Sequence, residues 1–244
     1  MSTAQTIRDA VAEVERLRAE SRAAPELAQR VLRIKQLQAA RFAGTYADLL
    51  ASGDYGPAAR FFLEELYSER DFAERDAQFA RIAGALETFF PRDVAETARV
   101  LARLHALTES LDHALAGALP PAGEADVPAY VRAWKAVGRR EDRQRQLATV
   151  VAVGAEMTRL TRLRGLRTML RLMRGAASAA GLSALQRFLE NGFDTFAAVA
   201  KRRGGAEHFL QTIQEREQRL LELLFEGDAA AGEAELIRIL GQAR

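Results

Sequence analysis

The sequence has 244 residues, of which 48% are hydrophobic and 28% charged, and this balance excludes a disordered chain because it allows a substantial core. The absence of cysteine excludes disulfides, thiolate metal sites, thiol nucleophiles and cysteine-bound iron–sulfur clusters. No apolar run reaches about 18 residues, and residues 1–21 carry acidic side chains where a secretory signal needs an apolar block, so we expect a cytoplasmic protein.

Helical periodicity runs through the whole sequence, and no segment shows the two-residue alternation of a half-buried strand. The first helices are expected at about residues 4–20 and 25–50, the second with Pro25 in its first turn. The pattern as a whole predicts an all-α protein, a compact multi-helix bundle of about nine or ten helices.

The stretch YGPAARFFLEELY, residues 55–67, predicts a helix with one apolar side. The residues assigned to the core are Phe62, Leu63 and Leu66. Glu64 and Glu65 face elsewhere, so we expect them to be solvated or paired with arginine. Phe61 and Tyr67 are the residues expected to contact another helix.

Two further helices are expected at about residues 71–90 and 91–117, and both carry polar residues on or beside an apolar stripe. Asp76 falls inside the stripe of the first helix. His105, Thr108 and Asp112 follow the flank of the second at three- and four-residue steps, which places them along one side. These residues are candidates for a buried polar network.

The segment GALPPAGEADVP, which contains Pro120 and Pro121, is the best linker candidate because its composition does not hold a helix. We expect residues 1–244 to form a single all-helical domain. Its helical halves would be residues 1–118 and 127–244, joined by this Pro/Gly segment.

The second half begins with a long helix expected at about residues 128–163 and a short one that follows Gly165. In the short helix, Arg167, Arg171 and Arg174 share one face and predict an exposed basic patch without internal pairing. The stretch GAASAAG after it is expected to be a turn. Helices at about 183–200 and 206–225 and a terminal helix complete the chain, and Arg216 lies in or beside the stripe of the penultimate one.

Asp76 and Arg216 are charged residues set into separate apolar stripes, and a buried charge requires a partner. The simpler interpretation is an ion pair or a hydrogen-bonded network, and a proton-transfer role is the alternative. His105 likewise is either a structural histidine bonded to a carboxylate or carbonyl, or an axial ligand to haem iron.

No recognisable catalytic motif accompanies these residues: the sequence lacks a phosphate-binding glycine loop after a strand, a zinc-type His-Glu-x-x-His and a serine elbow. We therefore expect no catalytic residues, no metal and no cofactor, apart from the haem alternative at His105. The favoured function is a non-catalytic interaction or regulatory protein. The alternative is a globin-like sensor that binds haem or another small molecule.

The net charge of +2 is unevenly spread along the chain. Residues 132–203 hold sixteen basic and five acidic side chains, a net +11, so the remainder sums to −9. Either the two regions attract each other or the basic one faces an anionic partner. As a partner we rank an acidic protein first, an anionic membrane surface second and nucleic acid third. For the face of Arg167, Arg171 and Arg174, the simpler interpretation is that it is solvated and binds no partner.

Three stretches carry a family resemblance: FFLEELY at 61–67, RDAQFARI from Arg75 and LHALTESLD from Leu104. With them, the chain resembles a family of bacterial helical proteins named after the FFLEELY motif. The similarity continues through AAGLSALQRFLENGFDTF and HFLQTIQERE. The resemblance implies one compact all-helical unit, and it implies no particular activity, cofactor or catalytic residue.

Overall fold

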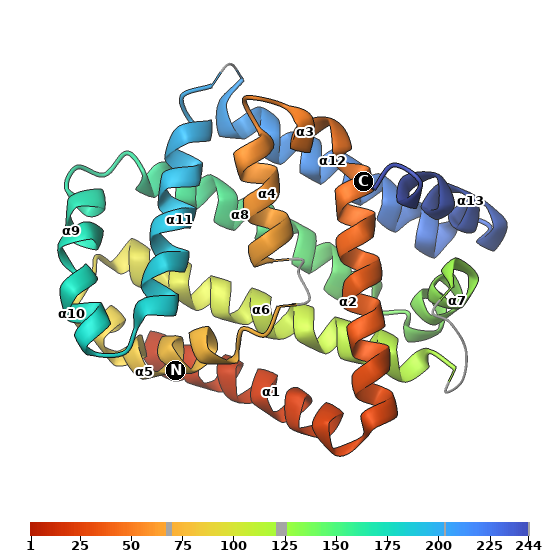
Figure 1. Ribbon diagram of the computed structural model, residues 1–244, viewed down its shortest axis with the longest axis horizontal. Coiled ribbons are helices and arrows are strands. Elements are labelled where there is room, and N and C mark those ends of the chain that lie inside the picture. Colours follow the sequence, from red (N-terminus) through yellow and green to blue (C-terminus); the bar gives the residue numbers. More distant parts are fainter. Residues whose placement is uncertain (67–69, 121–125, 203, 244) are drawn as a thin grey trace.

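The computed structural model describes residues 1–66, 70–120, 126–202 and 204–243, and Figure 1 shows its course. Thirteen α-helices and no strand are found in these ranges. In chain order the helices are α1 (Thr3–Ala23), α2 (Pro25–Thr45), α3 (Ala47–Ala51), α4 (Gly56–Glu65), α5 (Ala73–Phe89), α6 (Arg92–Ala118), α7 (Val127–Val137), α8 (Arg140–Leu160), α9 (Leu166–Leu172), α10 (Arg174–Ala179), α11 (Ser183–Val199), α12 (Gly205–Glu226) and α13 (Ala229–Leu240).

The all-α prediction is confirmed, but the expected nine or ten helices are too few within the described ranges. The expected helix at 25–50 breaks at Tyr46, which lies between α2 and α3. The expected helix at 128–163 breaks at Gly138, whose left-handed φ of 66° ends α7. The stretch expected to be a turn forms α10, because alanine favours the helix strongly enough to continue it to Ala179.

Helix α6 organises the fold. It runs along the long axis of the molecule, with α1 beside it and α5 packed on α1 (Figure 1). On another side α6 packs on α8, and α11 crosses this pair and contacts α4, α5 and α8. Helices from both expected halves therefore pack on each other, while the division into halves stays a prediction, since the central linker residues 121–125 lie outside the described ranges.

The buried side chains form three groups rather than one continuous core. The largest joins α2, α3, α4, α6, α7, α8, α11, α12 and α13, and it contains Tyr46, Tyr130 and Trp134. A second group lies between α1, α5 and α6, and a third between α8, α9 and α11. Space that side chains do not fill remains between these groups.

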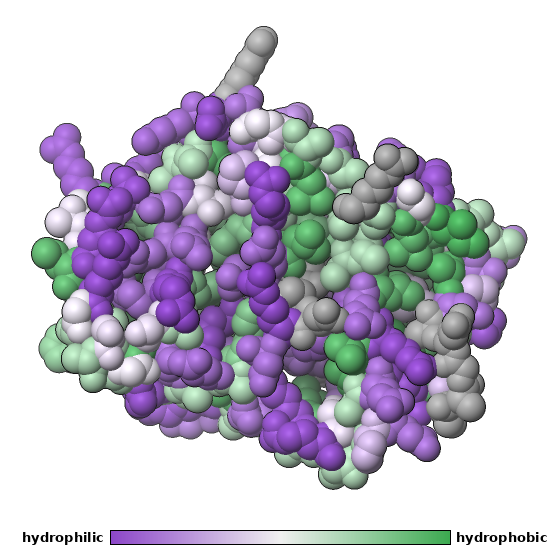
Figure 2. Space-filling model, viewed as in Figure 1, coloured by the Kyte–Doolittle hydropathy of each residue, from purple (hydrophilic) through white to green (hydrophobic). Residues whose placement is uncertain are grey.

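The surface in the view of Figure 2 is hydrophilic over α11 and more hydrophobic over α13. Ile237 of α13 is 59% exposed. Among the helices of the described ranges, none is both long enough and apolar enough to cross a membrane.

Candidate ligand-binding site

A cavity of about 160 Å³ lies between α2, α4, α5, α6, α8, α9 and α11. Helix α6 lines it from Val94 to Asp112, which corresponds to about 27 Å at the rise of an α-helix. Along this face the lining residues recur at three- and four-residue steps, so a single side of α6 forms one wall. The cavity is therefore long and narrow.

Most of the cavity wall is apolar. Phe79 and Ile82 of α5, Leu101 of α6 and Met157 of α8 line it together with Phe188 of α11. These five side chains are only partly buried, although they point into the helical bundle. Their remaining exposure is explained by the cavity, because a side chain that faces a void keeps surface that packing would otherwise cover.

A smaller apolar cavity of about 60 Å³ adjoins the first one. The two share lining residues, among them Leu101, Met157 and Phe188. Phe61 and Phe62 of α4 line the smaller cavity, which connects the FFLEELY stretch with this region. Phe188 lies between the two spaces and stacks on Phe61 with ring centroids 6.0 Å apart.

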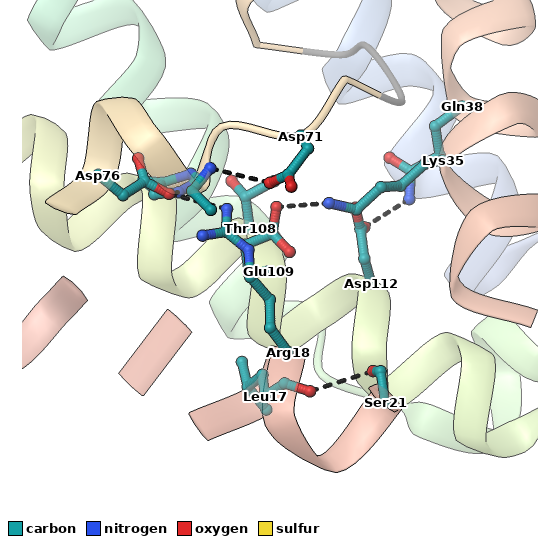
Figure 3. Close-up of polar contacts among 12 residues, drawn as sticks. Leu17, Arg18, Ser21, Lys35, Gln38, Asp71, Asp76, Thr108, Glu109 and Asp112 are labelled. Carbon is teal, nitrogen blue, oxygen red and sulfur yellow. Dashed lines mark hydrogen bonds and ion pairs between the residues drawn. The ribbon is translucent and has the colours of Figure 1, made fainter. Parts of the chain in front are cut away.

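The polar end of the cavity begins at Asp76 and His105. The Asp76 side chain is 4% exposed, and its Oδ2 lies 2.9 Å from Nε2 of His105. Arg18 reaches the same oxygen from α1 and donates to it at 2.8 Å (Figure 3). Burial alone would raise the pKa of the Asp76 carboxyl, but His105 and Arg18 together lower it. Asp76 is thus a buried carboxylate stabilised by two partners.

Arg75, the neighbour of Asp76 on α5, is held between aromatic rings. Its guanidinium carbon lies 3.9 Å from the ring centre of Phe72 and 4.6 Å from that of Phe188. The same guanidinium donates to Glu65 at 3.1 Å. Burial lowers the pKa of Arg75, although the nearby carboxylates oppose this effect.

Asp112 marks the far limit of the polar end. Its Oδ1 accepts a hydrogen bond from Gln38 of α2 at 2.6 Å (Figure 3). Arg143 of α8 lies 3.9 Å from the same oxygen. Burial raises the pKa of the Asp112 carboxyl, with Arg143 and Lys35 acting in the opposite direction. The environment of Asp112 therefore stabilises its charge less well than that of Asp76.

Two more contacts join α6 to its neighbours between these carboxylates. Lys35 of α2 lies 2.6 Å from Oε1 of Glu109. Gln146 of α8 donates to the hydroxyl of Thr108 at 2.8 Å. The polar end is thus built from side chains of α1, α2, α5, α6 and α8, which meet around one stretch of α6.

Comparison with protein families gives one result. A family model described as "Domain of unknown function (DUF8198)" matches residues 17–231. The chain belongs to this family. The match contains all of the cavity-lining residues, from Lys35 to Phe193, but its description does not name the FFLEELY motif, so that resemblance stays a prediction. No curated protein and no solved structure matches the chain.

The candidate polar residues do not form one network. The structure brings Asp76 and His105 into direct contact and places Thr108 and Asp112 further along the same cavity wall. Arg216 lies elsewhere: it forms two 2.7 Å hydrogen bonds to the carboxylate of Asp48 and one to the carbonyl of Thr45. Its side chain is 35% exposed, because α12 turns this position toward the edge of α3.

The FFLEELY residues take different environments on α4. Phe62 is buried and packs against Phe196 and Phe209. Glu64 and Glu65 pair with arginines, at 3.4 Å to Arg70 and 3.1 Å to Arg75 respectively. Tyr67 lies outside the described residues.

The three arginines of the basic patch are exposed, but two have internal partners. Arg167 of α9 lies 2.8 Å from Asp194 of α11, and Arg174 of α10 pairs with Glu190 of α11. For Arg171, no hydrogen bond or ion pair is found within the described parts of the chain. The expected lack of internal pairing is therefore wrong for Arg167 and Arg174, because α11 brings two acids within reach of them.

Sequence reasoning missed several polar residues in or directly behind the cavity wall, namely Arg18, Lys35, Gln38, Arg75 and Gln146. The first four each lie beside an apolar stripe, as His105 does, and the same signal could have selected them. No sequence signal singles out Gln146, because it lies in a charged stretch of α8 and faces the cavity only through the packing of α8 on α6.

Within the described ranges, no group of three histidine, aspartate or glutamate side chains is placed to hold a metal ion. A haem iron at His105 would have to compete with Asp76 for Nε2, the nitrogen that already carries the 2.9 Å contact.

Proposed function

We propose that the protein is a non-catalytic regulatory protein that binds an elongated, largely apolar small molecule in the cavity along α6. The observation that carries this proposal is the combination of a long apolar cavity with a polar cluster at one end only. Ligand sites are mostly apolar concavities in which a few polar groups fix the orientation of the ligand. The cavity has this composition.

The size of the cavity supports a small or slender ligand. An engineered protein cavity of about 150 Å³ stays dry and binds benzene, and the main cavity here has about 160 Å³. The adjoining cavity adds about 60 Å³. A porphyrin exceeds this space, so of the two sensor alternatives a small apolar ligand is favoured over haem.

The polar contacts support binding rather than catalysis. Asp76 and His105 resemble an acid–base pair, but a nucleophilic site also needs a hydroxyl in hydrogen-bonding reach of the imidazole. Within the described residues, no hydroxyl group is hydrogen-bonded to His105. Arg18 instead fixes Asp76 from α1, which is the arrangement of a structural ion pair.

The test is the binding of N-phenyl-1-naphthylamine, a neutral probe whose fluorescence rises in apolar surroundings. We expect saturable binding to the wild type and a loss of at least about tenfold in affinity in Leu101→Trp, because the larger ring fills the space that both cavities share. Leu172→Trp is the matched control, since Leu172 is 79% exposed on α9 and lines neither cavity.

Thermal unfolding of each variant is measured in parallel, and Ala98→Phe serves as a second blocking variant on the same wall of α6. If the folded wild type does not bind the probe, or if both blocking variants bind it as tightly as the Leu172→Trp control, the proposed function is wrong.

A further inference from the structure

The charged side chains at the polar end are unequally distributed around the cavity. Among the residues that the structure describes, four carboxylates line it, those of Glu65, Asp76, Glu109 and Asp112, whereas Lys35 and Arg75 are the lysine and arginine side chains that do so. Arg18 and Arg143 approach Asp76 and Asp112 from behind, because neither arginine lines this cavity. A bound molecule would therefore face more negative than positive charge.

Both lining cations already have partners. The ammonium group of Lys35 lies 2.6 Å from Glu109. The guanidinium of Arg75 lies against the rings of Phe72 and Phe188 and donates to Glu65. An anionic end group in the cavity would meet carboxylates without gaining a new cationic partner, and like charges at such distances repel.

The two ends of this polar stretch differ in how well their carboxylates are satisfied. Asp76 holds both Arg18 and His105 at hydrogen-bonding distance. Asp112 is 5% exposed and accepts from the neutral amide of Gln38, while Arg143 stays 3.9 Å away. The raised pKa of the Asp112 carboxyl agrees with this incomplete compensation of its negative charge. A cationic hydrogen-bond donor on the ligand would therefore gain more binding free energy beside Asp112 than beside Asp76.

We infer that the ligand is an amphiphilic amine, whose protonated nitrogen lies beside Thr108, Glu109 and Asp112 and whose hydrocarbon or aromatic body extends along α6 toward Val94. This assignment rests on the proposed function and adds the chemical class of the ligand. A buried carboxylate gains a charge-assisted hydrogen bond from an ammonium group.

The experiment compares octylamine, octanol and octanoate as competitors of N-phenyl-1-naphthylamine at neutral pH. The three have the same chain length and differ in the charge of the end group. In the wild type we expect octylamine to compete at a concentration at least about tenfold lower than octanoate, with octanol between them, since a charge-assisted bond is stronger than a neutral one.

The variant Asp112→Asn keeps the oxygen that accepts from Gln38 but removes the charge, so we expect it to lose most of the preference for octylamine over octanoate. Asp93→Asn is the matched control, because Asp93 is exposed on α6 and does not line the cavity. Should Asp112→Asn unfold, Glu109→Gln tests the same acidic surface.

The outcomes separate the two proposals. If octanoate competes as well as octylamine while both blocking variants, Leu101→Trp and Ala98→Phe, abolish probe binding, the ligand class is wrong and the binding function stands. The class is also wrong if the preference for octylamine persists in both Asp112→Asn and Glu109→Gln. If no probe binds to the wild type, both proposals fail.

Discussion

Nε2 of His105 on α6 lies 2.9 Å from Oδ2 of Asp76 on α5, and Arg18 of α1 donates to the same oxygen. One carboxylate thus joins three helices that are separate in sequence. The Asp76 side chain is 4% exposed. When its carboxylate is lost, bulk water therefore does not take its place beside His105 and Arg18.

Asp76→Asn should lower the free energy of unfolding by up to about 3–5 kcal/mol, the cost of leaving a buried charge without its counter-charge. The charges left behind are those of Arg18, whose side chain is 15% exposed and keeps Glu15 at 3.0 Å, and of Arg75, which lies 3.8 Å from Asp76 and keeps Glu65. These remaining partners place the expected effect below the upper limit. Urea unfolding measures the effect. Asp9→Asn is the control, because Asp9 is exposed on α1 and pairs with Gln5, and its effect should stay within about 0.5 kcal/mol. Equal stabilities of the two variants would contradict a structural role for Asp76.

The pH dependence of stability should differ in sign between Asp76 and Asp112. Folding lowers the pKa of Asp76, so its stabilising effect is present above about pH 4, the ordinary range of aspartate, and disappears as the pH falls through the lower folded value. Folding raises the pKa of Asp112, so its ionised form costs stability above the raised value. This cost shrinks as the pH falls below that value and is gone below the ordinary range of aspartate.

Urea unfolding of the wild type, Asp76→Asn and Asp112→Asn across pH tests these signs. The destabilisation by Asp76→Asn should shrink toward acidic pH. By contrast, Asp112→Asn removes the cost of a buried charge, so its gain in free energy of unfolding relative to the wild type should be largest at neutral pH. Parallel pH profiles for the two variants would show that one of the two environments is misassigned.

Gly44 allows close contact between α2 and α13. A Cβ atom at this position would overlap the carbonyl oxygen of Ile239, a backbone atom that does not move aside easily. We expect Gly44→Ala to destabilise the protein by about 1–3 kcal/mol in thermal or urea unfolding, as overpacking does. Gly117→Ala in α6 is the matched control, because a Cβ atom added there would have no heavy atom of a neighbouring group within 4 Å, and it should stabilise by up to about 1 kcal/mol. Similar effects of the two substitutions would contradict the close contact.

The basic patch should bind an acidic partner weakly and in a salt-dependent manner, since Arg167 and Arg174 already face Asp194 and Glu190. We expect retention on polyglutamate at low salt to fall most in Arg171→Glu. Arg219→Glu on α12 is the control for a change in net charge. Vesicles with anionic lipid and duplex DNA are tested alongside, and stronger retention on either would reverse the ranking of partners.

The sequence predicts the helices better than their ends. Apolar periodicity identifies long helices such as α6, because their stripe is maintained over many turns. It does not locate the breaks at Tyr46 and Gly138, since the residues on both sides continue a helical pattern. It also misassigns α10, because Gly175 and Gly181 indicate a turn while the alanines between them favour a helix.

The candidate site was predictable only in part. Asp76 and His105 are visible as polar intrusions in apolar stripes, but their 2.9 Å contact depends on how α5 packs near α6. The cavity itself has no sequence signal, because the residues that line it look like ordinary core residues. Arg216 gives the same signal as Asp76, yet it pairs with Asp48 near the surface.

The walls of the cavity come from two stretches of the chain, with α2, α4, α5 and α6 before residue 120 and α8, α9 and α11 after residue 126. A molecule bound there would contact both stretches at once, so it would bind the assembled form and not either stretch alone. By mass action, a ligand at one hundred times its dissociation constant adds about 2.7 kcal/mol to the stability of the form that binds it. Occupancy would then add to the contacts that already join the two stretches in the largest buried group.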